Sequence, residues 1–202
     1  MRHDRSVQMR TQRLTLRPWD PDDEADVRAA LDIYRRPEVV EWLSRPPRPS
    51  TTEAQARERL VRWAGVAAAR PGFGLWAVVP DSVGHPVGTV LLVPLPGADG
   101  VPTDDIEIGW HLHPDHWGSG YATEGARELL AHAFDELGLP VVNAVAFAGN
   151  EPSFAVMRRL GLTPRGTTDR WYGTEFAWWA IERGPSRPSP PARPVGADTP
   201  RT

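Results

Sequence analysis

Two side chains in one short segment have the chemistry of a proton acceptor. Glu107 carries a carboxylate, which acts as a general base when its pKa is raised, and His111 carries an imidazole, which titrates near neutrality. In a strand their Cα atoms lie about 13 Å apart, so at most a chain of water molecules connects them. A structural carboxylate satisfied by a neighbouring Arg or Tyr is the alternative for Glu107.

The histidines at 111, 113 and 116 raise the question of a metal site. The sequence has no cysteine, and no obvious acidic residues complete a set of ligands around them. We therefore expect no metal, and we expect His116 to have a positional role.

A glycine-rich turn, Gly118-Ser119-Gly120, follows these residues. Glycines let the backbone approach a bulky anion, and the free N–H groups of a following helix then bind it. The turn lacks the Gly-Lys-Ser/Thr of a Walker loop and the third glycine of a dinucleotide fingerprint. Alone it is also compatible with a plain tight turn before a helix.

The elements that must position these residues follow from periodicity. Alternating apolar and polar residues predict a strand over Ile106–Leu112, and apolar residues at three- and four-residue steps predict a helix over Ala122–Leu137. Gly138 is a suitable stop for this helix. A β-branched run predicts a buried strand at Val141–Phe147, and Asn150 is placed to cap the next helix.

The rest of the chain supplies further strands and helices around this unit. Helices are expected after Asp20–Asp23 and from Ser50–Glu53, the second with Leu60, Val61, Trp63, Ala64 and Ala67 on its buried face. Strands are expected at Leu14–Leu16, Phe73–Val79, Val87–Val93 and Glu175–Ile181, with a short strand or loop at Thr163–Asp169.

Composition narrows the function. The chain has 202 residues, 40% hydrophobic residues and a net charge of -3, which fits one globular domain without a nucleic-acid-binding face. The absence of lysine and cysteine excludes Schiff-base and thiolate chemistry. No signal peptide or membrane-spanning run is present, so we expect a cytoplasmic protein with a flexible N-terminus (1–10), one domain (11–183) and a disordered Pro/Arg-rich tail (184–202).

Three separate motifs together resemble a known family. WHLHPDHWGSGYATEGA (Trp110–Ala126), NEPSFAVMRRLGL (Asn150–Leu162) and TQRLTLRPWDPDD (Thr11–Asp23) resemble the GNAT superfamily of acyl-CoA-dependent N-acetyltransferases. The resemblance is strongest to its RimJ/RimL branch, which acetylates protein N-termini. It covers roughly 10–183 and implies an α/β (α+β) fold with a mixed, mostly antiparallel twisted sheet of six to seven strands. Helices cover both faces, and a central strand–helix–strand crossover splays to admit acetyl-CoA.

The resemblance also implies which residues bind acetyl-CoA. The family's Arg/Gln-x-x-Gly-x-Ala/Gly turn places Trp117 at the charged first position, so its backbone N–H must serve the pyrophosphate. Asn150 is implied to contact the pantetheine, with Ser153 close to the thioester or adenylate. N–H groups near Leu112 and His113 are implied to polarise the thioester carbonyl. The implied set is Leu112, His113, Trp117, Gly118, Ser119, Gly120, Tyr121, Ala122, Thr123, Asn150 and Ser153.

For catalysis, the resemblance implies that Glu107, alone or with His111, deprotonates the acceptor amine. Many family members place a Tyr acid seven residues after the Asn of the last helix, where this chain has Met157. Ser153, Tyr172 or a water molecule can replace this Tyr as the proton donor. Alternatively, the CoA thiolate leaves without receiving a proton from an acid.

Several alternatives for the function stay open at this point. The resemblance favours direct acetyl transfer to a protein N-terminal α-amine, in a homodimer. A small-molecule amine such as an antibiotic is a second acceptor class, and a non-catalytic acyl-CoA-binding module is a third possibility.

Overall fold

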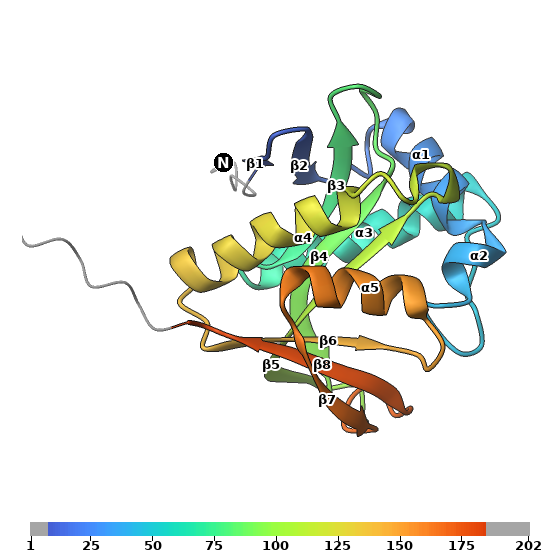
Figure 1. The fold of residues 1–202 in the computed structure, drawn as a ribbon. Helices are drawn as coiled ribbons and strands as arrows, with labels where there is room; N and C mark the ends of the chain where they lie inside the picture. Colours follow the sequence, from blue (N-terminus) through green and yellow to red (C-terminus); the bar gives the residue numbers. More distant parts are fainter. Residues whose placement is uncertain (1–7, 185–202) are drawn as a thin grey trace, which may run out of the picture.

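The computed structural model describes residues 8–184, so the predictions made for residues 1–7 and 185–202 lie outside the described chain (Figure 1). Met9 and Arg10, assigned above to a loose N-terminus, form the short strand β1 (Met9–Arg10). The Met9 side chain is buried in the core, which accounts for their order.

One eight-stranded sheet organises the domain, in the order β1-β2-β3-β4-β5-β6-β8-β7. All neighbouring strands are antiparallel except β5 and β6, so the predicted mixed, mostly antiparallel sheet is confirmed, with eight strands instead of six to seven. The strands after β1 are β2 (Leu14–Pro18), β3 (Gly74–Pro80), β4 (Gly88–Pro96), β5 (Pro102–Leu112), β6 (Val141–Ala146), β7 (Thr163–Thr168) and β8 (Phe176–Glu182).

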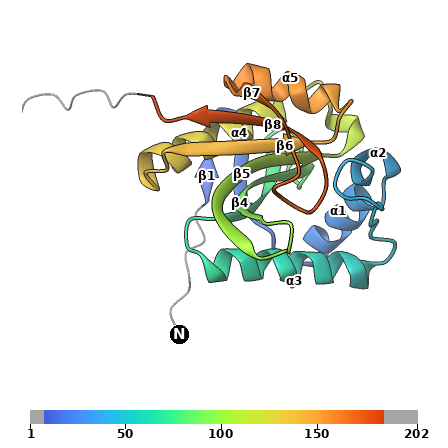
Figure 2. The same ribbon diagram turned by 90° about the horizontal axis from the view of Figure 1, so that it is seen from below.

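Helices cover both faces of this sheet, as expected (Figure 2). One face carries α4 (Tyr121–Ala131) and α5 (Glu151–Leu160), and the other carries α1 (Glu24–Tyr34) and α3 (Glu53–Ala69). A short helix α2 (Pro37–Val40) lies between α1 and α3, a 3-10 turn (Pro114–His116) precedes α4, and a π-helical segment (His132–Glu136) extends it.

Two hydrophobic cores follow from the two covered faces. Ile108 and Leu112 of β5 lie in the core under α4 and α5, whereas Tyr34 belongs to the core between α1, α3 and the sheet. Strand side chains alternate, so Glu107 and His111 lie on the α1/α3 face of β5. The contact between His111 and Tyr34 agrees with this.

The parallel strands β5 and β6 pair at one point only. The recorded register joins Glu107 to Asn143, and no further pair connects the two strands within the described residues. Asn143 holds the junction, because its Nδ2 donates to the Ile106 carbonyl at 3.3 Å and its Oδ1 accepts from Trp178 Nε1 at 2.9 Å. Beyond it the strands separate, as the sequence resemblance implied.

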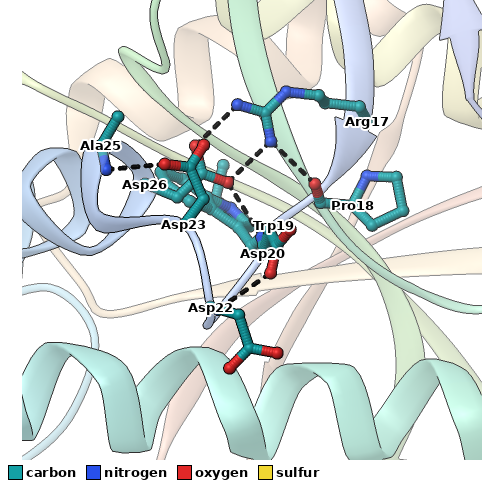
Figure 3. Close-up of polar contacts among 9 residues, drawn as sticks. Arg17, Pro18, Trp19, Asp20, Asp22, Asp23, Ala25 and Asp26 are labelled. Atoms are coloured by element: carbon teal, nitrogen blue, oxygen red, sulfur yellow. Dashed lines mark hydrogen bonds and ion pairs between the residues drawn. The ribbon is translucent and has the colours of Figure 1, made fainter.

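A partly buried ion pair fixes the corner between β2 and α1 (Figure 3). Both terminal nitrogens of Arg17 bind the Asp26 carboxylate at 2.6 Å, and the side chain of Asp26 is fully buried. Asp26 also accepts the Asp20 N–H at 2.9 Å. Trp19 lies in sequence between Arg17 and Asp20, so the clamp restrains the backbone that carries its indole.

Three local predictions require correction. The N-cap of helix α3 is Thr52, whose side chain accepts the Gln55 N–H, and the helix does not begin at Ser50. Val61 is 55% exposed and Ala64 is exposed as well, because the face that α3 buries centres on Ala56 and Leu60. Strand β5 begins at Pro102, ahead of the apolar alternation, since its first residues pair with the end of β4.

Candidate active site

A cleft of about 1440 Å³ lies along the line where β5 and β6 separate. It runs from the glycine turn before α4 to the loop between β7 and β8, and it borders the segment that follows α2. Every residue assigned to the site from sequence lines this cleft except His113 and Ser119. Residues that lie far apart in the sequence, such as Glu107, Gly120 and Tyr172, therefore line one cavity.

The glycine turn has the geometry of an anion cradle. Gly118 and Gly120 adopt left-handed conformations, with φ of 76° and 83°. Gly120 is the N-cap of α4 and offers no side-chain hydrogen bond to the first turn. The N–H groups of Tyr121, Ala122 and Thr123 are thus left for a ligand at the positive end of the helix dipole.

Arg13 of the β1–β2 corner braces this turn, and sequence reasoning missed it. Its guanidinium donates to the Ser119 carbonyl at 3.1 Å and pairs with Glu124 at 2.6 Å. Desolvation opposes ionisation of Glu124, but hydrogen bonds from Thr11 and Arg13 outweigh it and lower the pKa of this carboxyl. No local spacing could reveal a contact between residues 106 positions apart.

Five further arginines line the same cleft, and two of them lie on the helices beside the turn. These two are Arg127 of α4 and Arg159 of α5. Arg158, the neighbour of Arg159, instead faces Glu151 at 3.7 Å. The positive charge that the family pattern places at position 117 is therefore available from other elements of the fold.

Trp117 folds back onto the end of β5. Its Nε1 donates to the Leu112 carbonyl at 2.8 Å, while 48% of the residue stays exposed. The neighbouring His113 N–H donates to the Val87 carbonyl at 2.9 Å, so it is not free to bind a ligand, contrary to the expectation for His113. N–H groups alternate in direction along a strand, so that of Leu112 points the other way, toward the gap.

The carboxylate of Glu107 lies in the cleft beside Tyr172. The phenol of Tyr172 donates to Glu107 Oε2 at 2.5 Å. Desolvation raises the pKa of Glu107 to about 7, although the hydrogen bond from Tyr172 acts in the opposite direction. Burial and the adjacent Glu107 raise the pKa of Tyr172 far above its usual value, so the phenol keeps its proton. Glu107 is thus poised to exchange a proton near neutral pH.

His111 differs from Glu107 in its electrostatics. Desolvation and the nearby Arg59 cation lower the pKa of His111 to about 4. The imidazole is therefore neutral at physiological pH and a weak base. Its Nδ1 lies 3.3 Å from the hydroxyl of Tyr34.

His113 and His116, the other two histidines considered for a metal site, contact each other. The rings of His113 and His116 lie 5.9 Å apart, and His113 Nε2 faces Asp32 at 3.2 Å. Across residues 8–184 no group of three or more His, Cys, Asp and Glu side chains is arranged to hold a metal ion.

The first turn of α5 forms another wall of the cleft. Asn150 Oδ1 accepts the Ser153 N–H at 3.2 Å, which confirms Asn150 as the N-cap. Its contact with pantetheine stays a prediction. Ser153 and the buried Met157 also line the cleft, and a thioether has no proton to give to a departing thiolate.

Comparison with known proteins agrees with this geometry. Residues 13–163 match the family model described as an acetyltransferase (GNAT) domain. The chain belongs to the GNAT acetyltransferases. Members of this family transfer acetyl groups, and the family implies acetyl-CoA as the co-substrate.

Individual GNAT relatives differ in coverage. The FsC-acetyl coenzyme A-N(2)-transacetylase of Aspergillus fumigatus is 42% identical over 107 residues, 52% of this chain but only 45% of that protein. YdaF of Bacillus subtilis, provisionally named a ribosomal N-acetyltransferase, is 28% identical over 153 residues, 76% of this chain and 79% of the relative. A GNAT-family acetyltransferase from Bacillus anthracis has the same fold, with a TM-score of 0.70 and 21% identity over 88% of this chain and 99% of its own.

The GNAT site has the features that acetyl-CoA requires. The uncapped N-terminus of α4 suits a pyrophosphate, and Arg13, Arg127 and Arg159 offer positive charge. The opened β5–β6 edge offers free backbone groups to an extended pantetheine arm.

Within residues 8–184 no helix is long and apolar enough to cross a membrane.

Proposed function

We propose that this GNAT enzyme transfers the acetyl group of acetyl-CoA directly to a primary amine, with Glu107 as the general base. The observation that carries the proposal is the cleft-facing carboxylate of Glu107, whose pKa desolvation raises to about 7. Only a neutral amine attacks a thioester, and a base that titrates near the working pH accepts the ammonium proton effectively.

The remaining roles follow from the cleft. The α4 N-terminus with Gly118 and Gly120 binds the pyrophosphate, and the Leu112 N–H polarises the thioester carbonyl. Ser153 lines the cleft and is a candidate proton donor to the thiolate, whereas Tyr172 holds its proton on Glu107. A separate acid is not required for a thiolate whose pKa is near neutral.

For the acceptor we propose a protein N-terminal α-amine, as in the RimJ/RimL branch. The provisional name of YdaF supports this choice, because that relative aligns with most of the chain. A small-molecule amine is the second candidate, favoured by the 42% identity to a relative named as an N(2)-transacetylase of FsC. A homodimer and a cytoplasmic location stay predictions from the resemblance.

The test is thiol release from acetyl-CoA in the presence of N-terminal peptides or small amines, with the wild type and Glu107→Gln. We expect the wild type to release CoA only with an amine present. The variant should bind acetyl-CoA normally but turn over about 100-fold more slowly or worse. Equal turnover by both proteins would exclude Glu107 as the base, and release without an amine would exclude direct transfer.

A further inference from the structure

A series of hydrogen-bonded, buried polar groups reaches His111 on the α1/α3 face of the sheet. Trp19 Nε1 donates to Thr89 Oγ1 at 3.1 Å, Thr89 Oγ1 lies 2.6 Å from Tyr34 Oη, and Tyr34 Oη lies 3.3 Å from His111 Nδ1. Trp19, Thr89 and Tyr34 are all buried. This series of hydrogen bonds connects the residue after β2, strand β4 and helix α1 to β5, the strand that carries the proposed base.

The chemistry of the donors gives this series a direction. An indole N–H only donates, so the Thr89 oxygen accepts from Trp19. Among the described residues the Thr89 proton has one possible acceptor, the Tyr34 oxygen. Tyr34 must then give its own proton to His111 Nδ1. The reverse order would leave the Thr89 hydroxyl proton unpaired in the core, which costs the desolvation of a buried donor.

This direction fixes the tautomer of His111. An imidazole that accepts at Nδ1 carries its proton on Nε2. The ring lines the cleft, and Nε2 has no partner within residues 8–184. The charged and titratable neighbours are Tyr34 of α1, Arg59 of α3 and, along β5, Glu107. Burial and Arg59 favour the neutral ring, so it offers the cleft a fixed N–H donor.

Gly109 lies between Glu107 and His111 on the same face of β5, and it also lines the cleft. Because Gly109 has no side chain, Leu91 of the paired strand β4 packs over it, and a Cβ added at Gly109 would meet the Leu91 side chain at 3.1 Å. Leu91 also lines the cleft, so the floor between the carboxylate and the imidazole is apolar and offers an acceptor no competing hydrogen bond. We infer that His111 donates its Nε2 proton to a carbonyl oxygen of the acceptor, while the acceptor's amine lies at Glu107. Tyr34, through Thr89 and Trp19, is the positioning residue. The inference rests on the proposed function and narrows the acceptor to amines that carry an amide carbonyl several bonds away.

The tautomer is tested without any turnover. Nitrogen-15 NMR of the histidine rings of the full chain should show His111 as the Nε2–H tautomer and not titrating between about pH 5.5 and 8. In Tyr34→Phe the ring should become a mixture of tautomers. An Nδ1–H tautomer in the wild type overturns the inference, as does a His111 signal that Tyr34→Phe leaves unchanged while only the melting temperature falls.

The contact with the acceptor is tested by kinetics on Ala-Ala-Ala amide, with n-hexylamine as the amine that lacks a carbonyl. For the peptide we expect His111→Leu and Tyr34→Phe to raise KM about three- to tenfold with little change in kcat or in the pH profile. His111→Gln should recover much of the loss, because its amide N–H can replace Nε2–H. The KM for hexylamine should be the same in all four proteins.

Each alternative result has a distinct meaning. Equal KM changes for the two amines, or no saturable use of the peptide by the wild type, overturn the carbonyl contact. Loss of the acid limb of the pH profile in His111→Leu would instead make His111 a base and overturn the donor role. A wild type that shows the Nε2–H tautomer but acetylates no amine contradicts the proposed function and the carbonyl contact, and leaves the fixed tautomer standing.

Discussion

The phenol of Tyr172 reaches across 65 positions of sequence to donate a 2.5 Å hydrogen bond to the carboxylate of Glu107. Tyr172 and Gly173 both adopt positive φ angles, of 60° and 63°, which is unfavourable for a tyrosine. The Tyr172 N–H, donating to the Pro96 carbonyl at 3.2 Å, helps to hold this conformation. A strained side chain held against a carboxylate of raised pKa is typical of a functional site.

Removing this hydrogen bond should move the pH dependence of the enzyme. The bond stabilises the ionised form of Glu107, so Tyr172→Phe should raise the carboxyl pKa above its value of about 7. Since the base acts when deprotonated, the acid limb of kcat/KM should shift upward by about one pH unit. Activity at pH 7 should fall and partly recover at higher pH.

The measurement is kcat/KM against pH for wild type, Tyr172→Phe and Glu107→Gln. The glutamine variant is the control, because it has no carboxyl to titrate and should lose the limb. An acid limb that stays in place in Tyr172→Phe, or moves to lower pH, would contradict the assignment of Glu107 as the titrating base.

The parts of the site that local patterns define were predictable from the sequence. The alternation around Glu107 gave it a strand and a face, and glycines at 118 and 120 indicated the turn before a helix. Asn150 was recognisable as a cap by its type and position. These features depend on neighbours a few residues away, which a sequence pattern records directly.

Contacts between distant elements were not predictable in this way. Tyr172 was a candidate, but nothing showed that it would meet Glu107, and the contact of Arg13 with Ser119 has no signature. The neutral state of His111 also depends on Arg59 and on burial by α1 and α3, which only the folded chain provides. Side-chain chemistry gave the candidates, and tertiary packing decides their charge states.

Arg13 should contribute to acetyl-CoA binding although it lies in the first described corner of the chain. Replacing it with glutamine removes the ion pair with Glu124 and a positive charge beside the anion cradle. Charge-assisted hydrogen bonds contribute more than neutral ones, so we expect Arg13→Gln to raise the Kd for acetyl-CoA about tenfold, measured by calorimetry.

Arg10→Gln is the matched control for that experiment. Arg10 pairs with Asp81 at 3.4 Å, and its side chain is mostly exposed. An exposed ion pair of this kind contributes little to stability, and Arg10 does not line the cleft, so the acetyl-CoA affinity should not change. Equal affinities of the two variants would remove Arg13 from the binding site.

The Arg17–Asp26 clamp should be a main determinant of stability. Asp26→Asn leaves Arg17 without its buried partner and weakens the acceptor of the Asp20 N–H. Because the Arg17 side chain is 30% exposed, water can partly solvate it in the variant, and losing the charge-assisted hydrogen bonds should cost about 2 kcal/mol of the free energy of unfolding. Urea denaturation followed by circular dichroism measures this change.

A control for the clamp lies two residues earlier in the same helix. Glu24→Gln removes an exposed pair with Arg57 and should cost less than about 1 kcal/mol. If Asp26→Asn were no more costly than Glu24→Gln, the clamp would not be what holds the β2–α1 corner.

Gly120 offers the sharpest separation of binding from folding, because the chain contains a matched glycine. Gly120 has φ of 83°, and a Cβ added there would lie 3.4 Å from Arg13 at the mouth of the anion cradle. Gly138 has φ of 67° after the α4 extension, with no atom within 4 Å of an added Cβ. Alanine at either position should cost about 1 kcal/mol of stability through backbone strain.

Only Gly120→Ala should also weaken acetyl-CoA binding in calorimetric titration, because its methyl group occupies the approach of the phosphates to the α4 N–H groups. Gly138→Ala should melt at a similarly lowered temperature and bind like the wild type. If both variants bind acetyl-CoA with unchanged affinity, the turn does not cradle the pyrophosphate. If both lose affinity together, the loss reflects destabilisation, and the phosphate site must lie elsewhere in the cleft.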